Sequence, residues 1–170
     1  MRRFLTTIGV LVLCARSAIA QQQADAERNA AIEAVRSIYQ ETEAAIKVNR
    51  YVRHDTTVTC GPLDLDQNFS FYRDSAGVVR RLDADVGTDD HAEVHHYYYD
   101  ATGRLRFIFV KYGAVTGAHM QERVYYDEDR HELRRLRERT SARSYPFQKV
   151  EPLWKPAEWY KEFCGESSGS

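Results

Sequence analysis

The chain lacks most of the features that mark an enzyme or a membrane protein. It has only 3 cysteines in 170 residues, and none of them forms the Cys-x-x-Cys pair of thiol–disulfide enzymes. It contains no Gly-x-Ser-x-Gly nucleophile elbow and no phosphate-binding glycine loop. Its longest apolar run, near the N-terminus, is far shorter than the ~20 residues of a membrane-spanning helix. We therefore expect no transmembrane span, and these absences favour a non-enzymatic role.

The first twenty residues are typical of a secretory signal peptide. Arg2 and Arg3 form a positive start, residues 8–13 are apolar, and Ala18-Ile19-Ala20 places small residues at a cleavage site. We expect cleavage after Ala20 and export to the periplasm or the cell exterior. Removal of this segment takes away three of the 24 Lys and Arg and none of the 25 acids, which leaves 21 against 25. A mature charge of about −4 does not suit a nucleic-acid partner.

Two cysteines remain after that cleavage, Cys60 and Cys164. An even pair in an exported chain predicts a disulfide, with two free thiols as the alternative. The bond would join the start of the sheet to the C-terminal segment across a loop of roughly 100 residues, which is worth about 4–5 kcal/mol in the chain-entropy account.

One short pattern occurs three times in the middle of the chain. The copies are FYRDSAGVVRRL at 71–82, YYYDATGRLRFI at 97–108 and VYYDEDRHELRRL at 124–136. Asp-x-x-Gly between apolar runs predicts a hairpin, because the Asp side chain bonds the backbone two residues on and Gly takes the left-handed position. The third copy has Arg130 in place of Gly and one inserted residue, so we expect a looser or longer loop there. Three successive hairpins predict a six-stranded antiparallel meander.

The flanks of the repeats alternate as strands do. Leu105, Phe107 and Phe109 alternate with Arg104 and Arg106. We expect one sheet face to be richer in Leu, Phe and Val and to carry a helix. The other face, richer in Arg, His and Tyr, should then remain in contact with water.

Residues 24–48 show the clearest helical periodicity. Apolar side chains recur at steps of three and four, from Ile32 through Val35 to Ala45. In the C-terminal segment, Pro156 is suited to the first turn of a short helix at 156–163. We expect Trp154 and Trp159 to cover the edge of the sheet, and a ligand cage is the alternative.

Together these patterns predict an α+β fold. It consists of an N-terminal amphipathic helix packed on a six- to seven-stranded antiparallel β-meander, with a short C-terminal helix. We expect a signal peptide at 1–20, a single domain at 21–164 and a disordered tail at 165–170.

Two local resemblances accompany this interpretation. The stretch Tyr99-Asp100-Ala101-Thr102-Gly103-Arg104-Leu105 resembles the tyrosine–aspartate (YD, or Rhs-type) repeat of secreted bacterial proteins, which implies hairpin geometry and no particular function. The opening helix at 31–39 looks like that of nuclear-transport-factor-2-like domains. That second resemblance implies a sheet wrapped around an apolar pocket, and sometimes an enzyme that catalyses isomerisation or hydrolysis.

The candidate binding surface is the exposed sheet face. We expect five of its side chains to stand together away from the helix, namely His95, Tyr97, Tyr99, Arg104 and Arg106. Tyrosine and arginine are enriched at protein interfaces. The sequence therefore favours an exported, non-enzymatic binding or interaction protein, of the kind that includes small inhibitors, whose partner is another protein or an envelope component.

A metal site is a further alternative. His91 and His95 lie four residues apart behind Asp89 and Asp90, and imidazole with carboxylate suits Zn²⁺. No third ligand is spaced convincingly, and ordinary polar side chains explain the same pattern. The sequence predicts no other cofactor.

Overall fold

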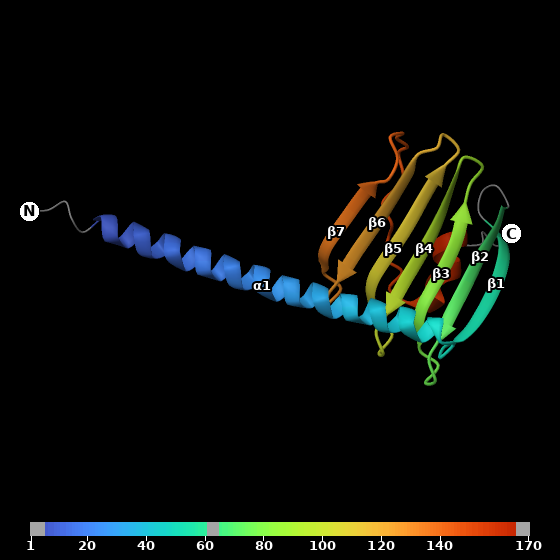
Figure 1. Cartoon of the computed structure of the whole chain (residues 1–170), viewed down its shortest axis with the longest axis horizontal. Helices are drawn as coiled ribbons and strands as arrows, with labels where there is room; N and C mark the ends of the chain where they lie inside the picture. The colour runs from blue at the N-terminus through green and yellow to red at the C-terminus, as the bar shows by residue number, and fades with distance from the viewer. Residues whose placement is uncertain (1–5, 61–64, 166–170) are drawn as a thin grey trace, which may run out of the picture.

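The chain forms one antiparallel sheet with a long helix before it and a short helix after it (Figure 1). The computed structural model describes residues 6–60 and 65–165, with side chains from residue 20 onward. The helices are α1 (Thr6–Lys47), η1 (Pro156–Glu158) and α2 (Trp159–Cys164). The strands are β1 (Val52–Cys60), β2 (Leu65–Arg73), β3 (Val79–Gly87), β4 (His91–Tyr99), β5 (Leu105–Ala114), β6 (His119–Tyr126) and β7 (Glu132–Arg139). They pair in chain order, so the predicted α+β meander is confirmed, with seven strands.

Helix α1 lies diagonally across one end of the sheet (Figure 1). Its buried side chains include Ile32, Val35 and Ala45, as the periodicity predicted. Ile32 and Val35 pack against a cluster of aromatic residues from three strands, Tyr98, Phe107 and Tyr125. Residues 20–30 are exposed and lie beyond the sheet. The helix starts earlier than predicted and runs through Ala20, so cleavage there stays a prediction. None of the described helices is long and apolar enough to cross a membrane.

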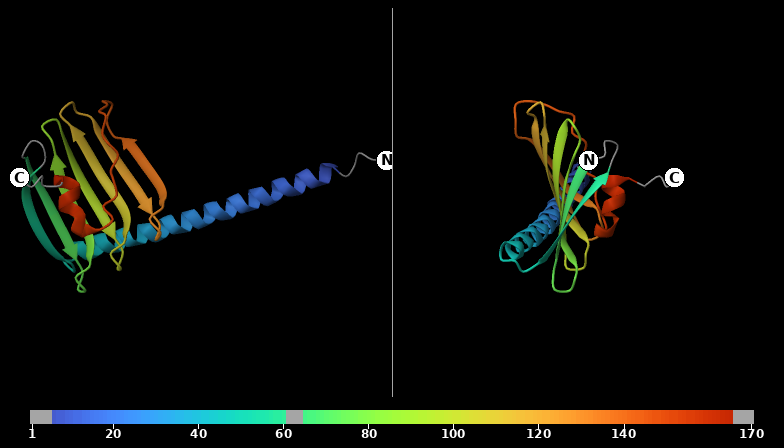
Figure 2. Two further views of the ribbon diagram at one scale, coloured as in Figure 1. Left: turned by 180° about the vertical axis from the view of Figure 1, so that it is seen from behind. Right: turned by 90° about the vertical axis from the view of Figure 1, so that its right-hand side faces the viewer.

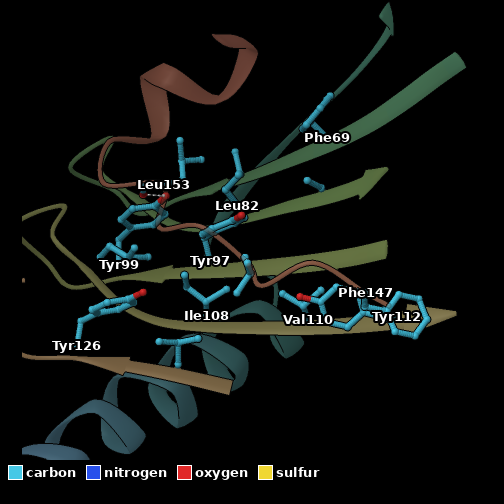
Figure 3. Close-up of a cluster of buried hydrophobic side chains, with 14 of the residues drawn as sticks. Phe69, Leu82, Tyr97, Tyr99, Ile108, Val110, Tyr112, Tyr126, Phe147 and Leu153 are labelled. Carbon is cyan, nitrogen blue, oxygen red and sulfur yellow. Dashed lines mark hydrogen bonds between the residues drawn. The ribbon is translucent and has the colours of Figure 1, made fainter. Parts of the chain in front are cut away.

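The opposite face of the sheet carries the larger core (Figure 3). Leu82, Tyr97, Ile108 and Val124 lie there with at most 1% of their surface exposed. The segment from 145 to 164, including α2, runs over these side chains. It lies in front of the sheet in the left view of Figure 2. The predicted disordered tail falls outside the described residues except for Gly165.

Polar contacts hold this C-terminal segment on the sheet. The Tyr99 hydroxyl donates to the carbonyl of Leu153 at 2.9 Å. Glu122 is fully buried, and one of its carboxylate oxygens accepts bonds from the Tyr112 hydroxyl at 2.8 Å and from the Val150 amide at 3.4 Å. The same carboxylate pairs with Arg135 and, at 3.3 Å, with Arg137.

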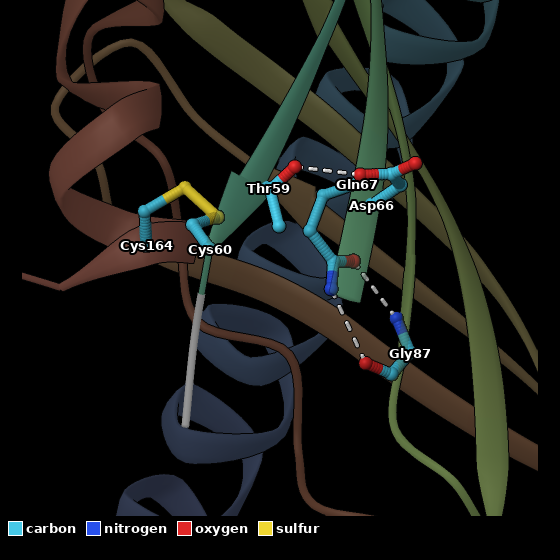
Figure 4. Close-up of a disulfide and its surroundings, with 6 residues drawn as sticks. All are labelled: Thr59, Cys60, Asp66, Gln67, Gly87 and Cys164. Carbon is cyan, nitrogen blue, oxygen red and sulfur yellow. Dashed lines mark hydrogen bonds between the residues drawn. A yellow bond between two sulfur atoms is a disulfide. The ribbon is translucent and has the colours of Figure 1, made fainter. Parts of the chain in front are cut away.

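The predicted disulfide joins Cys60, at the end of β1, to Cys164, at the end of α2 (Figure 4). Beside it, the Gln67 side chain bonds both the amide and the carbonyl of Gly87, at 3.0 and 3.3 Å, and so fastens β2 to the end of β3.

The three repeat turns have the same geometry. In the first, the carboxylate of Asp74 accepts the amides two and four residues on, each at 3.0 Å. Asp100 and Asp127 do the same at distances of 2.8 to 3.1 Å. Gly77 has φ of 81°, and Arg130 takes the same left-handed conformation with φ of 70°. The expectation of a looser or longer third loop is therefore wrong, because Arg130 adopts the conformation that glycine has in the first two copies.

This conformation makes Arg130 a test of the turn. A side chain in the left-handed region costs about 1 kcal/mol relative to glycine. Arg130→Gly is therefore expected to raise the free energy of unfolding, measured in urea titrations, by about 0.5–1 kcal/mol. The loss of the cation–π contact between the Arg130 guanidinium and the Trp154 ring, 5.5 Å apart, reduces this gain. Gly103→Ala, with φ of 80° in the wild type, is the matched control and should destabilise. A stabilisation by both substitutions would contradict the assigned turn.

A β-bulge follows each of these turns and changes which side chains share a face. Between β4 and β5, Tyr98 opposes Phe107 but Tyr99 opposes Leu105, so Arg106 is an extra residue. One extra residue moves the following side chains to the other face. Leu105 and Phe107 therefore lie on opposite faces, and the expectation that they share one is wrong.

The first two bulges use their extra arginine in the same way. Arg106 donates from Nε to the carbonyl of Tyr126 at 3.3 Å and contacts Asp100 at 3.4 Å through Nη1. Arg80 makes the corresponding bonds to the Tyr99 carbonyl and to Asp74, both at 3.3 Å. Each of these two arginines thus ties its own turn to the next strand of the sheet.

Candidate binding site

The predicted binding surface is largely buried. His95, Tyr97 and Tyr99 do lie on the face away from α1, but their exposed fractions are 6%, 1% and 0%. The C-terminal segment covers them: Phe163 of α2 lies 5.5 Å from the His95 ring and 6.2 Å from the Tyr97 ring. The expectation that this face is exposed is therefore wrong, because the C-terminal segment, which was expected only at the edge of the sheet, lies over it.

The two arginines of the predicted surface serve the second repeat turn. Arg104 and Arg106 contact the Asp100 carboxylate at 3.0 and 3.4 Å. Burial raises the pKa of Asp100, but hydrogen bonds from Thr102 and Arg104 outweigh that effect and lower it to about 2. Arg106 is 6% exposed and Arg104 alone of the five predicted residues faces solvent. These two side chains therefore stabilise a hairpin.

A row of titratable side chains follows β4 beside α2. The Glu93 carboxylate lies 2.7 Å from Nε2 of His95 and 3.4 Å from Nε2 of His91. His95 reaches the Tyr97 hydroxyl at 3.1 Å through its other ring nitrogen, and His91 reaches Asp90 at 2.8 Å. His91 and Glu93 of this row line one side of a cleft of about 250 Å³. It brings the predicted His91 and His95 to one carboxylate.

A zinc ion shared by His91 and His95 does not fit this row. Glu93 lies between the two rings, and the ligand atoms of His91, Glu93 and His95 do not form a group within 4.8 Å of one another among the described residues. A different group, Asp127, Asp129 and His131, has ligand atoms within 4.8 Å of one another in the described part of the chain. Its Asp127 carboxylate already accepts the amides that close the third turn, so these contacts are accounted for by the hairpin.

The exposed sheet surface lies on the helix side instead. Helix α1 covers the row of Tyr98, Phe107 and Tyr125, and leaves the strands uncovered beyond it (Figure 1). Two residues further along these strands, on the same face, lies a second row of side chains. In this row His96 opposes Phe109, Phe109 opposes Arg123 and Arg123 opposes Leu136 on β7. We call this row, with Lys111 beside it, the open face: His96, Phe109, Lys111, Arg123 and Leu136.

Two cations and an imidazole lie against the ring at the centre of the open face. The Arg123 guanidinium lies 4.9 Å from the centroid of Phe109, and the Lys111 ammonium lies 5.6 Å from it. His96 stacks on the same ring at 5.9 Å. Leu136, at the end of the row, is 43% exposed. This combination of an aromatic centre with flexible cations is suited to contact with a partner.

A shallow groove connects the open face to α1. Its volume is about 270 Å³, and none of the described residues that line it is acidic. Arg36, Tyr39 and Gln40 form the helix wall, and Phe109 and Arg123 belong to the sheet wall. Tyr39 is 37% exposed, so the groove presents an aromatic and two guanidinium groups together.

Sequence reasoning missed the open face, although helix dimensions could have indicated it. A helix is about 10 Å wide, whereas strands of eight to ten residues span roughly 26–34 Å. One helix therefore leaves much of its side of the sheet uncovered, and the strand residues beyond it must face solvent or a partner.

Comparisons with known proteins found no match to a protein-family model, to a curated protein or to a solved structure.

Proposed function

We propose that the protein is an exported, non-catalytic interaction protein that binds another macromolecule of the cell envelope through the open face. The observation that carries this proposal is the Phe109 ring, half-buried at the centre of the row with Lys111 and Arg123 against it. The open face replaces the buried surface around Tyr97 as the place of contact.

The two cations at the centre of the open face favour an acidic partner. Lys111 has no acidic partner among the described residues, and Arg123 reaches Glu138 only at 3.6 Å, where the Glu138 side chain is 68% exposed. Exposed pairs of this kind contribute less than about 1 kcal/mol, so both cations remain available. A carboxylate-bearing segment of another envelope protein would pair with them and cover Phe109.

The extent of the surface favours a macromolecule over a small molecule. The groove beside α1 is smaller than the ~300 Å³ that small-molecule sites usually offer. The open face, in contrast, crosses β4 to β7 in one continuous row. Arginine and aromatic side chains at the centre of such a surface are the residues that most often dominate binding energy.

Site-specific photocrosslinking tests this proposal in cells. With p-benzoylphenylalanine at Lys111, we expect one discrete crosslinked species in envelope extracts. The matched control places the same group at Val115, which is 77% exposed in the turn after β5 but outside the open face. Arg123→Glu is expected to reduce the Lys111 crosslink about tenfold, because it places an acid against an acidic partner.

Equal crosslinking from Lys111 and Val115, or a Lys111 crosslink that Arg123→Glu leaves unchanged, would contradict the proposal. Circular dichroism of each purified variant separates loss of binding from loss of folding.

A further inference from the structure

A second and larger groove lies on the other side of the sheet, between η1–α2 and the edge strands. Its volume is about 470 Å³, within the usual range for small-molecule sites. It is unrelated to the open face. The described residues that line it are His54, Thr56, Phe71, Arg73, Val79, Gly103, Pro156, Ala157 and Trp159.

One wall of this groove is a fixed aromatic surface. The Trp159 ring lies 4.4 Å from Phe69 and 5.7 Å, edge-on, from Phe71. Phe71 is 5% exposed and Val79 is 6% exposed, so the floor is apolar and anchored in the core. The disulfide at Cys164 holds the helix that carries Trp159 against β1. The position of the tryptophan ring is therefore set before any ligand arrives.

The other wall is polar and has no acidic group among its described residues. Arg73 donates from Nη1 to the carbonyl of Gly77 at 3.2 Å, which leaves the rest of its guanidinium without a described partner. His54 and Thr56 have no side-chain hydrogen bond among the described residues and also line the groove. Unpaired donors beside an apolar floor are the arrangement that fixes the orientation of a small ligand.

We propose that this groove binds a small organic anion that carries a ring. The ring would lie against Trp159 and Phe71, and the anionic group would accept hydrogen bonds from Arg73, with Thr56 and His54 available to a hydroxyl. Charge complementarity selects an anion, because Arg73 is the charged side chain of the described lining and that lining contains no acid. Guanidinium–carboxylate bonds are the strongest of these contacts and would set the specificity.

Nuclear magnetic resonance of the mature, oxidised chain tests the site directly. The indole N–H of Trp159 is the reporter, and Trp154→Phe assigns it, because Trp154 packs elsewhere against Tyr126. One arm uses naphthalene-2-carboxylate against the neutral naphthalene-2-methanol, and the second uses glucuronate against glucose. We expect a saturable shift of the Trp159 signal with at least one carboxylate, at least tenfold tighter than with its neutral analogue. Which arm saturates distinguishes an aromatic acid from an acidic sugar.

Two variants make the assignment specific. Arg73→Gln is expected to weaken carboxylate binding about tenfold and to leave the neutral analogue unchanged. Ala157→Asp, at an exposed position of the groove, should weaken it similarly by repulsion. Arg139→Gln, on the edge strand at the far side of the sheet, is the matched control and should have no effect. The proposal is overturned if neither carboxylate saturates by about 10 mM, or if Arg73→Gln and Arg139→Gln change the affinity equally.

Discussion

Replacement of both Cys60 and Cys164 by serine is expected to lower the free energy of unfolding by about 4–5 kcal/mol. The bond links residues 104 apart in the sequence, and a crosslink across a loop of that length removes a large part of the entropy of the unfolded chain. Loss of the bond also frees α2, whose Phe163 covers His95 and Tyr97. This is the largest effect that we expect from any change at two positions.

Urea unfolding measures it on three samples: the oxidised chain, the same chain with a reductant, and the double variant. The reduced chain and the double variant should coincide and unfold at lower urea concentration than the oxidised chain. Mass spectrometry of the protein purified without reductant should show two hydrogens fewer than the reduced form. Two thiols that react with an alkylating agent, or coincident unfolding of all three samples, would disprove the bond.

Glu122→Gln is expected to destabilise the fold by about 3 kcal/mol. The Glu122 side chain is 0% exposed and pairs with Arg135 and Arg137. Removal of its charge leaves two guanidinium groups without their shared carboxylate, and breaking a buried pair costs about 3–5 kcal/mol. The lower end of that range applies because the arginine side chains are 17% and 29% exposed.

The matched control for this substitution is Glu138→Gln. Glu138 lies on the neighbouring strand and its side chain is 68% exposed, so its pairing with Arg123 is worth less than about 1 kcal/mol. Unfolding titrations of both variants at one pH and salt concentration give the comparison. A Glu122→Gln protein within 1 kcal/mol of wild type, or equal losses in both variants, would show that the buried carboxylate does not hold the C-terminal segment.

Much of the fold follows from short-range chemistry that the sequence displays. Asp74 and Gly77 specify a turn by themselves, and the helix stripe through Ile32 and Val35 needs only its periodicity. The pairing of Cys60 with Cys164 follows from the count of cysteines that remain after the predicted signal peptide. Each of these features depends only on residues close in sequence or on composition, and for that reason it could be predicted. The structure confirms all three.

The faces of the sheet could not be assigned in the same way. The extra residue at Arg106 reverses the alternation of β5, and nothing in a period-2 pattern marks where such a bulge lies. The covering of Tyr97 and Tyr99 depends on residues 145–164, in which a short helix can be predicted but not the sheet face over which it lies. Long-range packing decides both points, and for that reason the predicted site lay on a surface that the chain itself fills.

The disulfide also has a topological consequence. Together with the backbone from Cys60 to Cys164, it closes a covalent ring that contains β2 to β7, whereas α1 and most of β1 lie outside that ring. A single proteolytic cut in any hairpin from β2 onward would leave the two pieces joined, whereas a cut before Cys60 or after Cys164 would release a fragment. A protein that is built in this way can be cut by a protease in the loops of its sheet and still remain one molecule.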